Sequence, residues 1–535
     1  MKIEKIEIKN FRSIQHAILV PSFLCALVGE NNSGKSNILC AINLVLGESW
    51  PSAKQITDDD IFNHEYDRDI EIKIWFDQGS VFTDAAGHDH LIKGFLLRYS
   101  HYKKKSGSHI KGDPKIDFLC IDGVGNEIKV IRRLPKAGSG LRPVPELLYV
   151  TSELRDMFPV VFIGVSRDLK YHLSGSQWTL FGKLLKEVER GFLSDQARKE
   201  SYSQKMSEIS ALLRIPLFET MEKMIEENVK KQTGLKQARL AFKEPPVLSH
   251  YKNLELNVRE SDGYSEAPAL EMGSGIQSAV VIALIQAYKD LQKVGGILMI
   301  EEPEVYLHPH TRRFFYQLLR SLAEKENQIF YTTHSVEFLD LSDYQNIAVI
   351  RKFPSDGTRV YQQQGLHILP GTKKELKLLT EFDARRNELF FARKVLIVEG
   401  PTEKHSLPFA FKLLGTDINE AGISIIDVDG KDNILFFIEI LKAFQIPFCV
   451  LHDEDRNANN YSAHHDGATG LNKKIENLAS NGLVFRVDPD FEGALGLPGG
   501  DKIKNARQKL MSLTDATQLP ESISKCLKNI LAIQT

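Results

Sequence analysis

The sequence predicts an α/β fold, in which a helical segment interrupts a P-loop head and a second, parallel α/β domain follows. Three observations carry the prediction. Residues 23–36 read as a buried strand, a loop rich in Gly, Asn and Ser, and the start of a helix. Residues 167–245 are charged, poor in Gly and Pro, and prone to form helices. Residues 394–453 contain three short apolar strands separated by helical segments, which is the pattern of a parallel sheet.

Hydrophobic periodicity places the N-terminal elements. Residues 2–9 alternate apolar and charged side chains, as a half-buried strand does. Residues 23–28 form a short buried strand, and residues 36–47 have the apolar spacing of a helix. Further strands are predicted over 70–76 and 117–133.

Changes of composition indicate the domain boundaries. Pro245 and Pro246 close the helical segment, and alternating strand and helix patterns resume over residues 251–352. We expect an N-terminal part of the head (1–166), a helical insertion (167–246), a C-terminal part of the head (247–380) and a second α/β domain (390–535).

The composition is that of an ordinary globular protein. The chain has 535 residues, 42% of them hydrophobic, and a net charge of −2, which excludes a broadly polybasic protein but not a local basic groove. The five cysteines are scattered and form no C-x-x-C pair, so neither a disulfide framework nor a thiolate zinc site is expected. Since no apolar run reaches 18 residues, we expect no membrane partner and a cytoplasmic location.

The strongest local signal is the octapeptide GENNSGKS, which fits the P-loop pattern G-x-x-x-x-G-K-[ST]. Its glycines allow the backbone to wrap around phosphates, and the following helix N-terminus adds partial positive charge. Lys35 is expected to reach the β- and γ-phosphates of ATP, and the Ser36 hydroxyl to bind Mg²⁺. The predicted nucleotide-binding residues are Gly29, Asn31, Asn32, Ser33, Gly34, Lys35 and Ser36.

A metal-directed acid and a water-activating base are expected at the end of another strand. Residues 296–302 read GILMIEE, an apolar strand that ends in two carboxylates. Glu301 is predicted to hold Mg²⁺, directly or through water, and Glu302 to polarise the attacking water. His334 follows a second apolar strand, in YTTHS, where a lone histidine is more often structural. The turn GSGIQ, at residues 273–277, opens a helix and is a further anion site.

The order P-loop, GSGIQ, EEPEVYLHP and TTHS resembles the ATP-binding-cassette (ABC) ATPases, in the soluble branch with the chromosome-maintenance and RecF-like proteins. The resemblance implies a dimer in which Ser274, Gly275 and Gln277 form a signature motif facing ATP on a partner subunit. It also implies that His334 is the switch histidine. One departure is that Glu301 stands where Asp is commoner, so a longer or water-mediated metal contact is expected. Gln55 is a candidate Q-loop glutamine, although an exposed polar role is favoured.

Four carboxylates mark strand ends in the C-terminal third. Glu399 follows the strand KVLIV, and Glu403 lies four residues on, at the start of a helix. Asp453 and Asp455 end a later strand, in PFCVLHDED. Strand ends of a parallel sheet meet where ligands bind, and converging carboxylates repel unless a cation neutralises them. Oxygen ligands suit Mg²⁺ or Mn²⁺, and two such ions about 4 Å apart would serve in-line attack on a phosphodiester.

This spacing resembles the Toprim domain of topoisomerases, primases and some nucleases. An ATPase head followed by Toprim is the architecture of the OLD (overcoming lysogenisation defect) family, and the resemblance covers about residues 1–510. It implies an ATP-linked, metal-dependent DNA endonuclease that forms a homodimer or a higher oligomer through the helical insertion. It also implies a role in defence against phage, alone or with a helicase-like partner or a retron's reverse transcriptase and small DNA.

The resemblance further implies acidic residues and a lysine after the D-x-D pair. RVDPDFEGALG offers Asp490 and Glu492, of which Glu492 joins the predicted metal ligands. GDKIKNARQ offers Lys502 and Lys504 to stabilise phosphate charge, with Lys502 preferred although Ile503 follows it where the family has Pro. For Asp427 and Asp429 a role that lines the site and a role in the turn at Asp429-Gly430 are both open, whereas for His452 a structural role is favoured over action on the substrate.

Two basic clusters could bind a phosphate backbone, and a solvated surface is the default interpretation of each. They are Lys103, Lys104, Lys105, Lys111 and Lys115, and Lys230, Lys231, Lys236, Arg239 and Lys243. An alternative function is an ATP-dependent DNA-binding clamp or repair factor without cleavage activity, which the full set of acids disfavours. A primase or topoisomerase is a third hypothesis, and a topoisomerase needs a tyrosine nucleophile in a separate domain.

Overall fold

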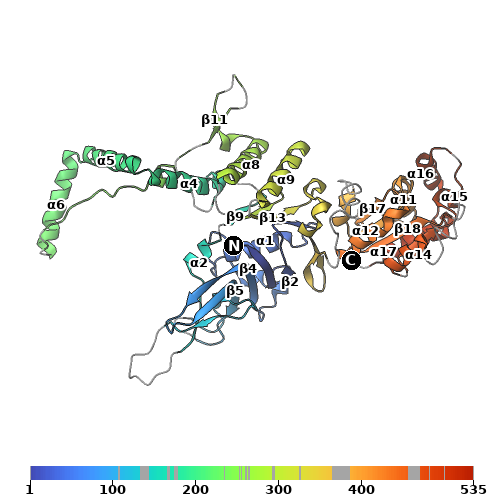
Figure 1. Cartoon of the computed structure of the whole chain (residues 1–535), viewed down its shortest axis with the longest axis horizontal. Coiled ribbons are helices and arrows are strands. Elements are labelled where there is room, and N and C mark those ends of the chain that lie inside the picture. Colours follow the sequence, from blue (N-terminus) through green and yellow to red (C-terminus); the bar gives the residue numbers. More distant parts are fainter. Residues whose placement is uncertain are drawn as a thin grey trace. The chain divides into compact units, whose positions relative to one another are not determined.

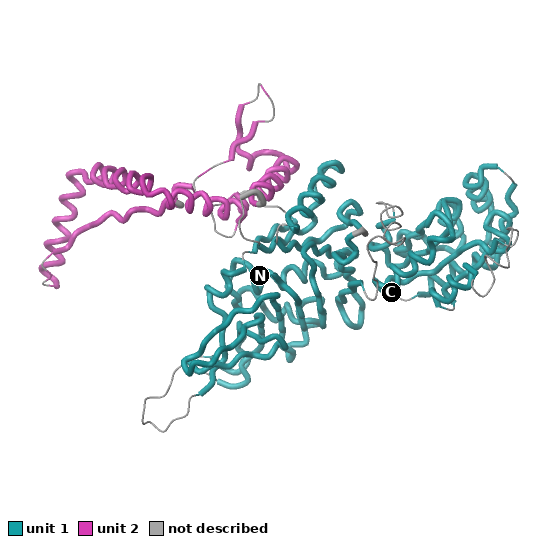
Figure 2. The backbone as a smooth tube through the Cα atoms, in the orientation of Figure 1, with its two compact units in different colours: residues 1–165, 295–535 teal, residues 166–294 magenta. Residues whose placement is uncertain are grey.

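The structure is a computed structural model. It describes residues 2–533 except 106–108, 133–143, 159, 166–168, 174–178, 234, 236, 252–253, 255, 260–261, 263–264, 292–295, 325–326, 364–385, 456–469, 481 and 499. Two compact units emerge, one of residues 1–165 and 295–535 and the other of residues 166–294 (Figure 2).

A mixed sheet forms the head (Figure 1). Its 11 strands lie in the order β6-β5-β4-β1-β2-β15-β14-β3-β13-β12-β9. The five strands from β14 to β9 run parallel, and the remaining pairings are antiparallel. The bounds are β1 Ile3–Phe11, β2 Ile14–Leu19, β3 Leu24–Val28, β4 Ile70–Thr83, β5 Asp89–His101, β6 Pro114–Ile121, β9 Val160–Ile163, β12 Ile297–Glu301, β13 Gln328–Thr333, β14 Ile347–Phe353 and β15 Gly357–Gln362.

Burial explains why the parallel strands are central. Every side chain of β3 and β13 is buried, as expected of strands covered on both faces. Helix α1 (Lys35–Leu46) follows β3 and packs against the sheet. Its buried apolar side chains include Ile38, Leu39 and Ile42. The head also contains α2 (Ser152–Asp156), α9 (Pro309–Ala323) and the short pair β7 (Lys129–Val130) and β8 (Glu146–Leu147). The P-loop connects β3 to α1, and the buried side chains of both elements fix the two ends of the loop.

The strand predicted over 117–133 is confirmed up to Ile121, is broken by a turn after it, and resumes as β7 at Lys129–Val130. The Asp122 carboxylate accepts hydrogen bonds from the backbone N–H groups of Val124, Gly125 and Asn126, so the chain turns there. The strand over 70–76 is confirmed and continues to Thr83.

The C-terminal region is a four-stranded parallel sheet in the order β17-β16-β18-β19. Its strands are β16 (Lys394–Val398), β17 (Ile423–Asp427), β18 (Phe448–Asp453) and β19 (Val484–Val487). Its helices are α11 (Pro401–Leu413), α12 (Lys431–Ala443), α14 (Leu471–Ala479), α15 (Phe491–Ala494), α16 (Lys502–Ser512) and α17 (Glu521–Ala532). The three strands predicted here are confirmed, and their carboxyl ends meet at one edge because all four strands are parallel.

The second compact unit is mainly helical. It contains α3 (Leu169–His172), α4 (Leu180–Ser194), α5 (Gln196–Leu212), α6 (Pro216–Thr233), α7 (Leu248–Tyr251), β10 (Asn257–Val258), β11 (Ala267–Pro268) and α8 (Ser274–Leu291). It extends beyond residue 246, where the predicted insertion ends, to Val294. The predicted boundary at residue 380 lies outside the described residues. Within the described part of the chain, no helix is long and apolar enough to cross a membrane.

Candidate functional site

The P-loop has the backbone that a phosphate-binding loop requires. Gly34 has a φ of 105° and caps the N-terminus of α1, a conformation that favours glycine. A Cβ at Gly29 would lie 2.1 Å from the carbonyl oxygen of Ile350, so only glycine fits there. Ser33 is buried and its hydroxyl has no partner among the described residues, whereas Asn31, Asn32 and Ser36 are exposed.

Lys35 is buried and folded back onto its own loop. Its ammonium donates hydrogen bonds to the carbonyl oxygens of Gly29, at 3.0 Å, and Glu30, at 2.7 Å. Burial lowers the pKa of Lys35 to about 8, although Glu302 and Glu304 nearby favour the charged form. The ammonium is therefore held inside the loop by two weak acceptors, which a phosphate could replace.

The predicted acids lie at the end of β12, beside the predicted histidine. Glu301 is the last residue of β12, and Glu302 has a φ of 43°. The Glu302 N–H donates to the carbonyl oxygen of Thr332, at 3.1 Å, which fixes this turn against β13. As a result, the Glu302 Oε1 lies 3.8 Å from Nε2 of His334. Burial, followed by the charge of Lys35, lowers the pKa of His334, so the ring is neutral near pH 7.

Glu304 is a candidate functional residue that the sequence interpretation missed. It is 7% exposed, and its Oε1 accepts hydrogen bonds from the His334 N–H, at 2.6 Å, and the Thr333 hydroxyl, at 2.9 Å. Burial raises the pKa of its carboxyl group. Its position two residues after Glu302 in EEPE was the available signal. Glu304 thus ties the loop that carries His334 to the acidic strand end.

The GSGIQ residues lie in the second unit. Helix α8 begins at Ser274, and Ser274 and Gly275 are exposed. The Gln277 side-chain amide donates to the carbonyl oxygens of Leu270, at 3.1 Å, and Met272, at 2.8 Å, so it braces the preceding turn. The role of this turn in binding ATP on a partner subunit stays a prediction. Gln55, in the head, is half-buried rather than exposed, and its Oε1 has no partner among the described residues.

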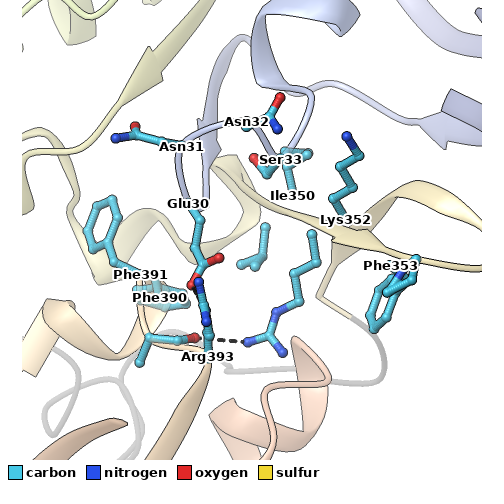
Figure 3. A pocket seen from close by; sticks show the side chains of 15 residues that line it. Glu30, Asn31, Asn32, Ser33, Ile350, Lys352, Phe353, Phe390, Phe391 and Arg393 are labelled. Carbon is cyan, nitrogen blue, oxygen red and sulfur yellow. Dashed lines mark hydrogen bonds and ion pairs between the residues drawn. The ribbon is translucent and has the colours of Figure 1, made fainter. Parts of the chain in front are cut away.

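A cavity of about 370 Å³ lies on the outer side of the P-loop (Figure 3). It is bounded by residues 29–33, by the end of β14 and by residues 390–393, which lead into β16. Glu30 pairs there with Arg393, and Arg351 donates a hydrogen bond to the carbonyl oxygen of Ala392, at 3.2 Å. These contacts connect the P-loop to the first strand of the C-terminal sheet.

The C-terminal acids gather at the carboxyl edge of the four-stranded sheet. Glu399 follows β16, Glu403 lies in the first turn of α11, and Asp453 ends β18. The Glu399 Oε1 accepts the Asp453 N–H at 2.7 Å, and the Asp453 Oδ1 accepts the Phe491 N–H at 2.8 Å. Burial and mutual repulsion raise the pKa of Glu399 to about 7 and those of Glu403 and Asp453 to about 8. The three carboxyl groups therefore resist ionisation unless a cation joins them.

Two lysines face the outer acids of this cluster. The Lys431 ammonium, at the start of α12, lies 2.8 Å from Oδ2 of Asp455. The Lys502 ammonium, at the start of α16, lies 3.2 Å from Oε1 of Glu492. Lys502 and Lys504 are both exposed, and the ion pair of Lys502 with Glu492 is what favours Lys502 of the two predicted lysines. The sequence interpretation missed Lys431, because a lysine at a helix start is usually solvated.

The three open residues near this edge have structural partners. Asp427 pairs with Lys404 of α11. Asp429 has a φ of 54°, and its carbonyl oxygen accepts the Asn433 side-chain amide at 3.3 Å, in a turn. The His452 Nδ1 lies 2.8 Å from the Asp453 carbonyl oxygen, and burial lowers the pKa of His452 to about 3, so the ring is neutral.

Comparison with known proteins places both sites in one family. Residues 390–455 match the domain described as "Overcoming lysogenization defect protein-like, TOPRIM domain", and residues 1–131 and 159–339 match "AAA ATPase domain". The OLD nuclease of Thermus scotoductus is 31% identical over 546 residues, which cover 97% of this chain and 97% of that protein. The chain belongs to the OLD nuclease family. The Old nuclease of Escherichia phage P2 is 25% identical and covers 93% of this chain and 83% of that protein.

Membership of the OLD family confirms the predicted fold, an ATPase head followed by a Toprim domain. It also confirms the predicted enzyme class, a hydrolase that combines an ATPase with a Toprim nuclease domain. The segment of residues 390–393 beside the P-loop is the first part of the Toprim match.

The Toprim acids of this OLD-family chain suit a hard divalent cation by their chemistry. Glu399, Glu403, Asp453, Asp455 and Glu492 supply only oxygen donors, and three of them have raised pKa values that a cation would lower again. In the described part of the chain, no three His, Cys, Asp or Glu side chains are arranged to bind one ion as they stand.

Proposed function

We propose that this OLD-family protein is an ATP-hydrolysing, divalent-metal-dependent endonuclease that nicks or cleaves DNA. The observation that supports cleavage best is the burial of Glu399, Glu403 and Asp453 together at one sheet edge, with raised pKa values. Burying three such groups costs folding free energy, which a purely structural role does not explain. The same observation disfavours a DNA-binding clamp without cleavage activity.

At the Toprim site the proposed metal ligands are Glu399, Glu403, Asp453, Asp455 and Glu492. Two Mg²⁺ or Mn²⁺ ions, when bound, would supply an activated water and stabilise the leaving oxygen. The protein's own part is to orient these acids. The Glu399–Asp453 hydrogen bond fixes the carboxylate of the first strand against the backbone of the later one. Lys502 is free to turn from Glu492 toward the scissile phosphate, because its side chain is 68% exposed.

At the head, residues 29 and 31–36 would hold ATP, with Ser36 and Glu301 directed to its Mg²⁺. Lys35 would exchange the carbonyl oxygens of Gly29 and Glu30 for the β- and γ-phosphates. Glu302 would polarise the attacking water, and His334 would sense the γ-phosphate while Glu304 holds its backbone. Ser274, Gly275 and Gln277 would complete the site of a second subunit.

The proposed homodimer has a surface that supports it. The tip of the helical unit carries large apolar side chains on and between α5 and α6 that are exposed to solvent, which is unusual for a monomer. They are Ile209, Leu212, Leu213, Ile215, Leu217, Met221, Met224 and Ile225. We propose that this tip packs on a second copy, which makes the helical insertion a dimerisation segment.

DNA would be held by exposed lysines. Lys103, Lys104, Lys105 and Lys111 are exposed on the segment between β5 and β6, whereas Lys115 is paired with Asp117 at 2.5 Å. In the second cluster Lys230, Lys231, Arg239 and Lys243 are exposed, and Lys236 lies outside the described residues. Such patches bind the phosphate backbone without reading bases.

The biological role we propose is defence against phage in the cytoplasm. Support comes from the family description, which refers to a lysogenization defect, and from the relative in Escherichia phage P2. The partner classes to test are a retron reverse transcriptase with its small DNA and a helicase-like protein.

The test is incubation of the full chain with supercoiled and linear DNA, with Mg²⁺ or Mn²⁺, and with and without ATP. We expect nicked and linear products that require metal and that disappear in Asp453→Asn. ATP turnover in Asp453→Asn should stay within about twofold of wild type. DNA binding without cleavage under every condition, with each partner class present, would favour the clamp instead.

A further inference from the structure

The acids of the Toprim site fall into two groups, those that are buried together and those that form an ion pair with a lysine. Glu399, Glu403 and Asp453 are buried together with raised pKa values. Asp455 forms an ion pair with Lys431, and Glu492 with Lys502. The two ion pairs differ in burial, since the Lys431 side chain is 6% exposed and that of Lys502 is 68% exposed. Lys502 can therefore leave Glu492 at little cost, whereas Lys431 is a cation built into the site.

We propose that Lys431 is a positioning residue that occupies Asp455 in the metal-free protein and must be displaced by the second divalent ion. This inference rests on the proposed metal-dependent function. It predicts that the two ions bind in order, the first at the buried acids and the second only when it replaces the lysine at Asp455.

The backbone around Lys431 holds it beside the metal ligands. Gly430, which precedes it, has a φ of 109° and donates its N–H to the carbonyl oxygen of Glu399 at 2.9 Å. The Asn433 side chain donates to the carbonyl oxygen of Val428 at 2.8 Å, which fixes the same turn. The start of α12 is thus tied to the strand that delivers the first ligand.

The ammonium of Lys431 also spans the D-x-D segment. It donates hydrogen bonds to the Asp455 carboxylate and to the carbonyl oxygen of Asp453. Asp455 itself has a φ of 55°, and its N–H donates to the carbonyl oxygen of Pro489 at 2.9 Å. The lysine therefore holds Asp455 in one orientation while its backbone is fixed by a neighbouring loop.

Removal of this lysine would change the charge balance of the site. A buried ion pair is costly to break on one side, because the remaining charge is left without compensation. Without Lys431, the Asp455 carboxylate would lose this cation while it lies beside Asp453 and Glu399, so the metal-free protein should be less stable. The Asp455 carboxylate would then attract the second ion without competition from the Lys431 ammonium.

The experiment measures Mn²⁺ binding to the full chain without DNA, by electron paramagnetic resonance of free Mn²⁺, together with thermal unfolding at each metal concentration. In the absence of nucleotide, and in a Glu301→Gln background that removes the proposed metal ligand of the head, the chain should show a tight and a weaker class of site in the Toprim domain. In Lys431→Met the weaker class should tighten by about tenfold. The added Asp455→Asn substitution should abolish that gain, since it removes the contested carboxylate.

Matched controls separate this effect from a general loss of charge. Lys404→Met removes a lysine at the same sheet edge that pairs with Asp427, and it should change neither binding constant. Asp455→Asn alone should lose the weaker class and keep the tight one, a readout that does not depend on whether Lys431→Met folds. An unchanged or weaker second constant in Lys431→Met, or retention of both classes in Asp455→Asn, would overturn the inference. Loss of all Mn²⁺ binding in wild type would instead overturn the proposed metal-dependent function.

Discussion

The two candidate sites differ in the sign of the charge that they bury. In the head, the cation Lys35 is buried on the carbonyl oxygens of its own loop, and burial lowers its pKa to about 8. In the Toprim domain, the acids are buried, and burial raises the pKa of Asp453 to about 8. The Lys35 ammonium thus donates its hydrogen bonds to neutral carbonyl oxygens, and the buried Toprim acids repel one another. These properties match a phosphate of ATP at the head and divalent cations at the Toprim site.

The sites also differ in how the chain assembles them. In the head, the acidic group comes from one short stretch, with Glu302 and Glu304 two residues apart at the end of β12. In the Toprim domain, the acids come from β16, α11, β18 and α15, so they meet only when the sheet and its helices have formed. Substitutions that destabilise the fold or change the local charge should therefore disturb the geometry of the Toprim site more than that of the head site.

Asp453→Asn should have the largest effect and reduce DNA cleavage by roughly 10³-fold or more, because the substitution removes a charge from the centre of the proposed metal site. ATP turnover should be almost unchanged, since the head does not use this residue. Cleavage of supercoiled plasmid and release of phosphate from ATP measure the two activities in one preparation. A matched fall in both would show that the sites are not separable.

Lys35→Ala should reduce ATP turnover by roughly 10²- to 10³-fold, since it removes the ammonium that would reach the β- and γ-phosphates. Lys54→Ala changes an exposed lysine of the head and serves as the control. Phosphate release under saturating ATP measures the effect. Turnover that persists at the wild-type rate in Lys35→Ala would contradict the P-loop assignment. Comparing the effect of ATP on DNA cleavage by wild type with its effect on this variant would show whether nucleotide activates or inhibits the Toprim domain.

Much of this arrangement could be predicted from local patterns, and the failures share one physical cause. Glu399 and Asp453 were found because each follows an apolar run that is a buried strand, and parallel strands bring their ends together. Lys431 was missed because its partner Asp455 is 24 residues away, and a lysine at a helix start reads as solvated without that contact. Helix α1 was predicted almost to the residue, whereas the turn at Asp122 depends on side-chain hydrogen bonds that no periodicity reveals.

Glu304→Ala should lower the rate of ATP hydrolysis by roughly tenfold to a hundredfold while the apparent affinity for ATP changes little, because Glu304 positions His334 and does not itself reach the nucleotide. Glu304→Gln should lose less, since its amide oxygen can still accept the His334 N–H. Steady-state kinetics of both variants, with KM and kcat reported separately, measure the difference. Equal losses in the two variants would indicate that the charge of Glu304, rather than its hydrogen bond, is what matters.

The smallest predicted effect is a pH dependence of stability that comes from the buried acids of the Toprim site. The pKa is about 7 for Glu399 and about 8 for Glu403 and Asp453, above the value near 4 expected in the unfolded chain. Between about pH 4 and pH 8 these three carboxyl groups therefore bind more protons in the folded protein than in the unfolded chain, so their contribution to stability falls as the pH rises. The buried neutral ring of His452, with a pKa of about 3, opposes this trend only below its unfolded pKa near 6.5, with one group against three. We expect the midpoint temperature of the metal-free Toprim transition in calorimetry to fall by several degrees between pH 5 and pH 8.

Added Mg²⁺ should oppose that shift, since it favours the ionised acids. Asp453→Asn should make the shift smaller, since it removes one of the three titrating groups. A transition that rises with pH in the metal-free protein would contradict the burial of these acids in their neutral form.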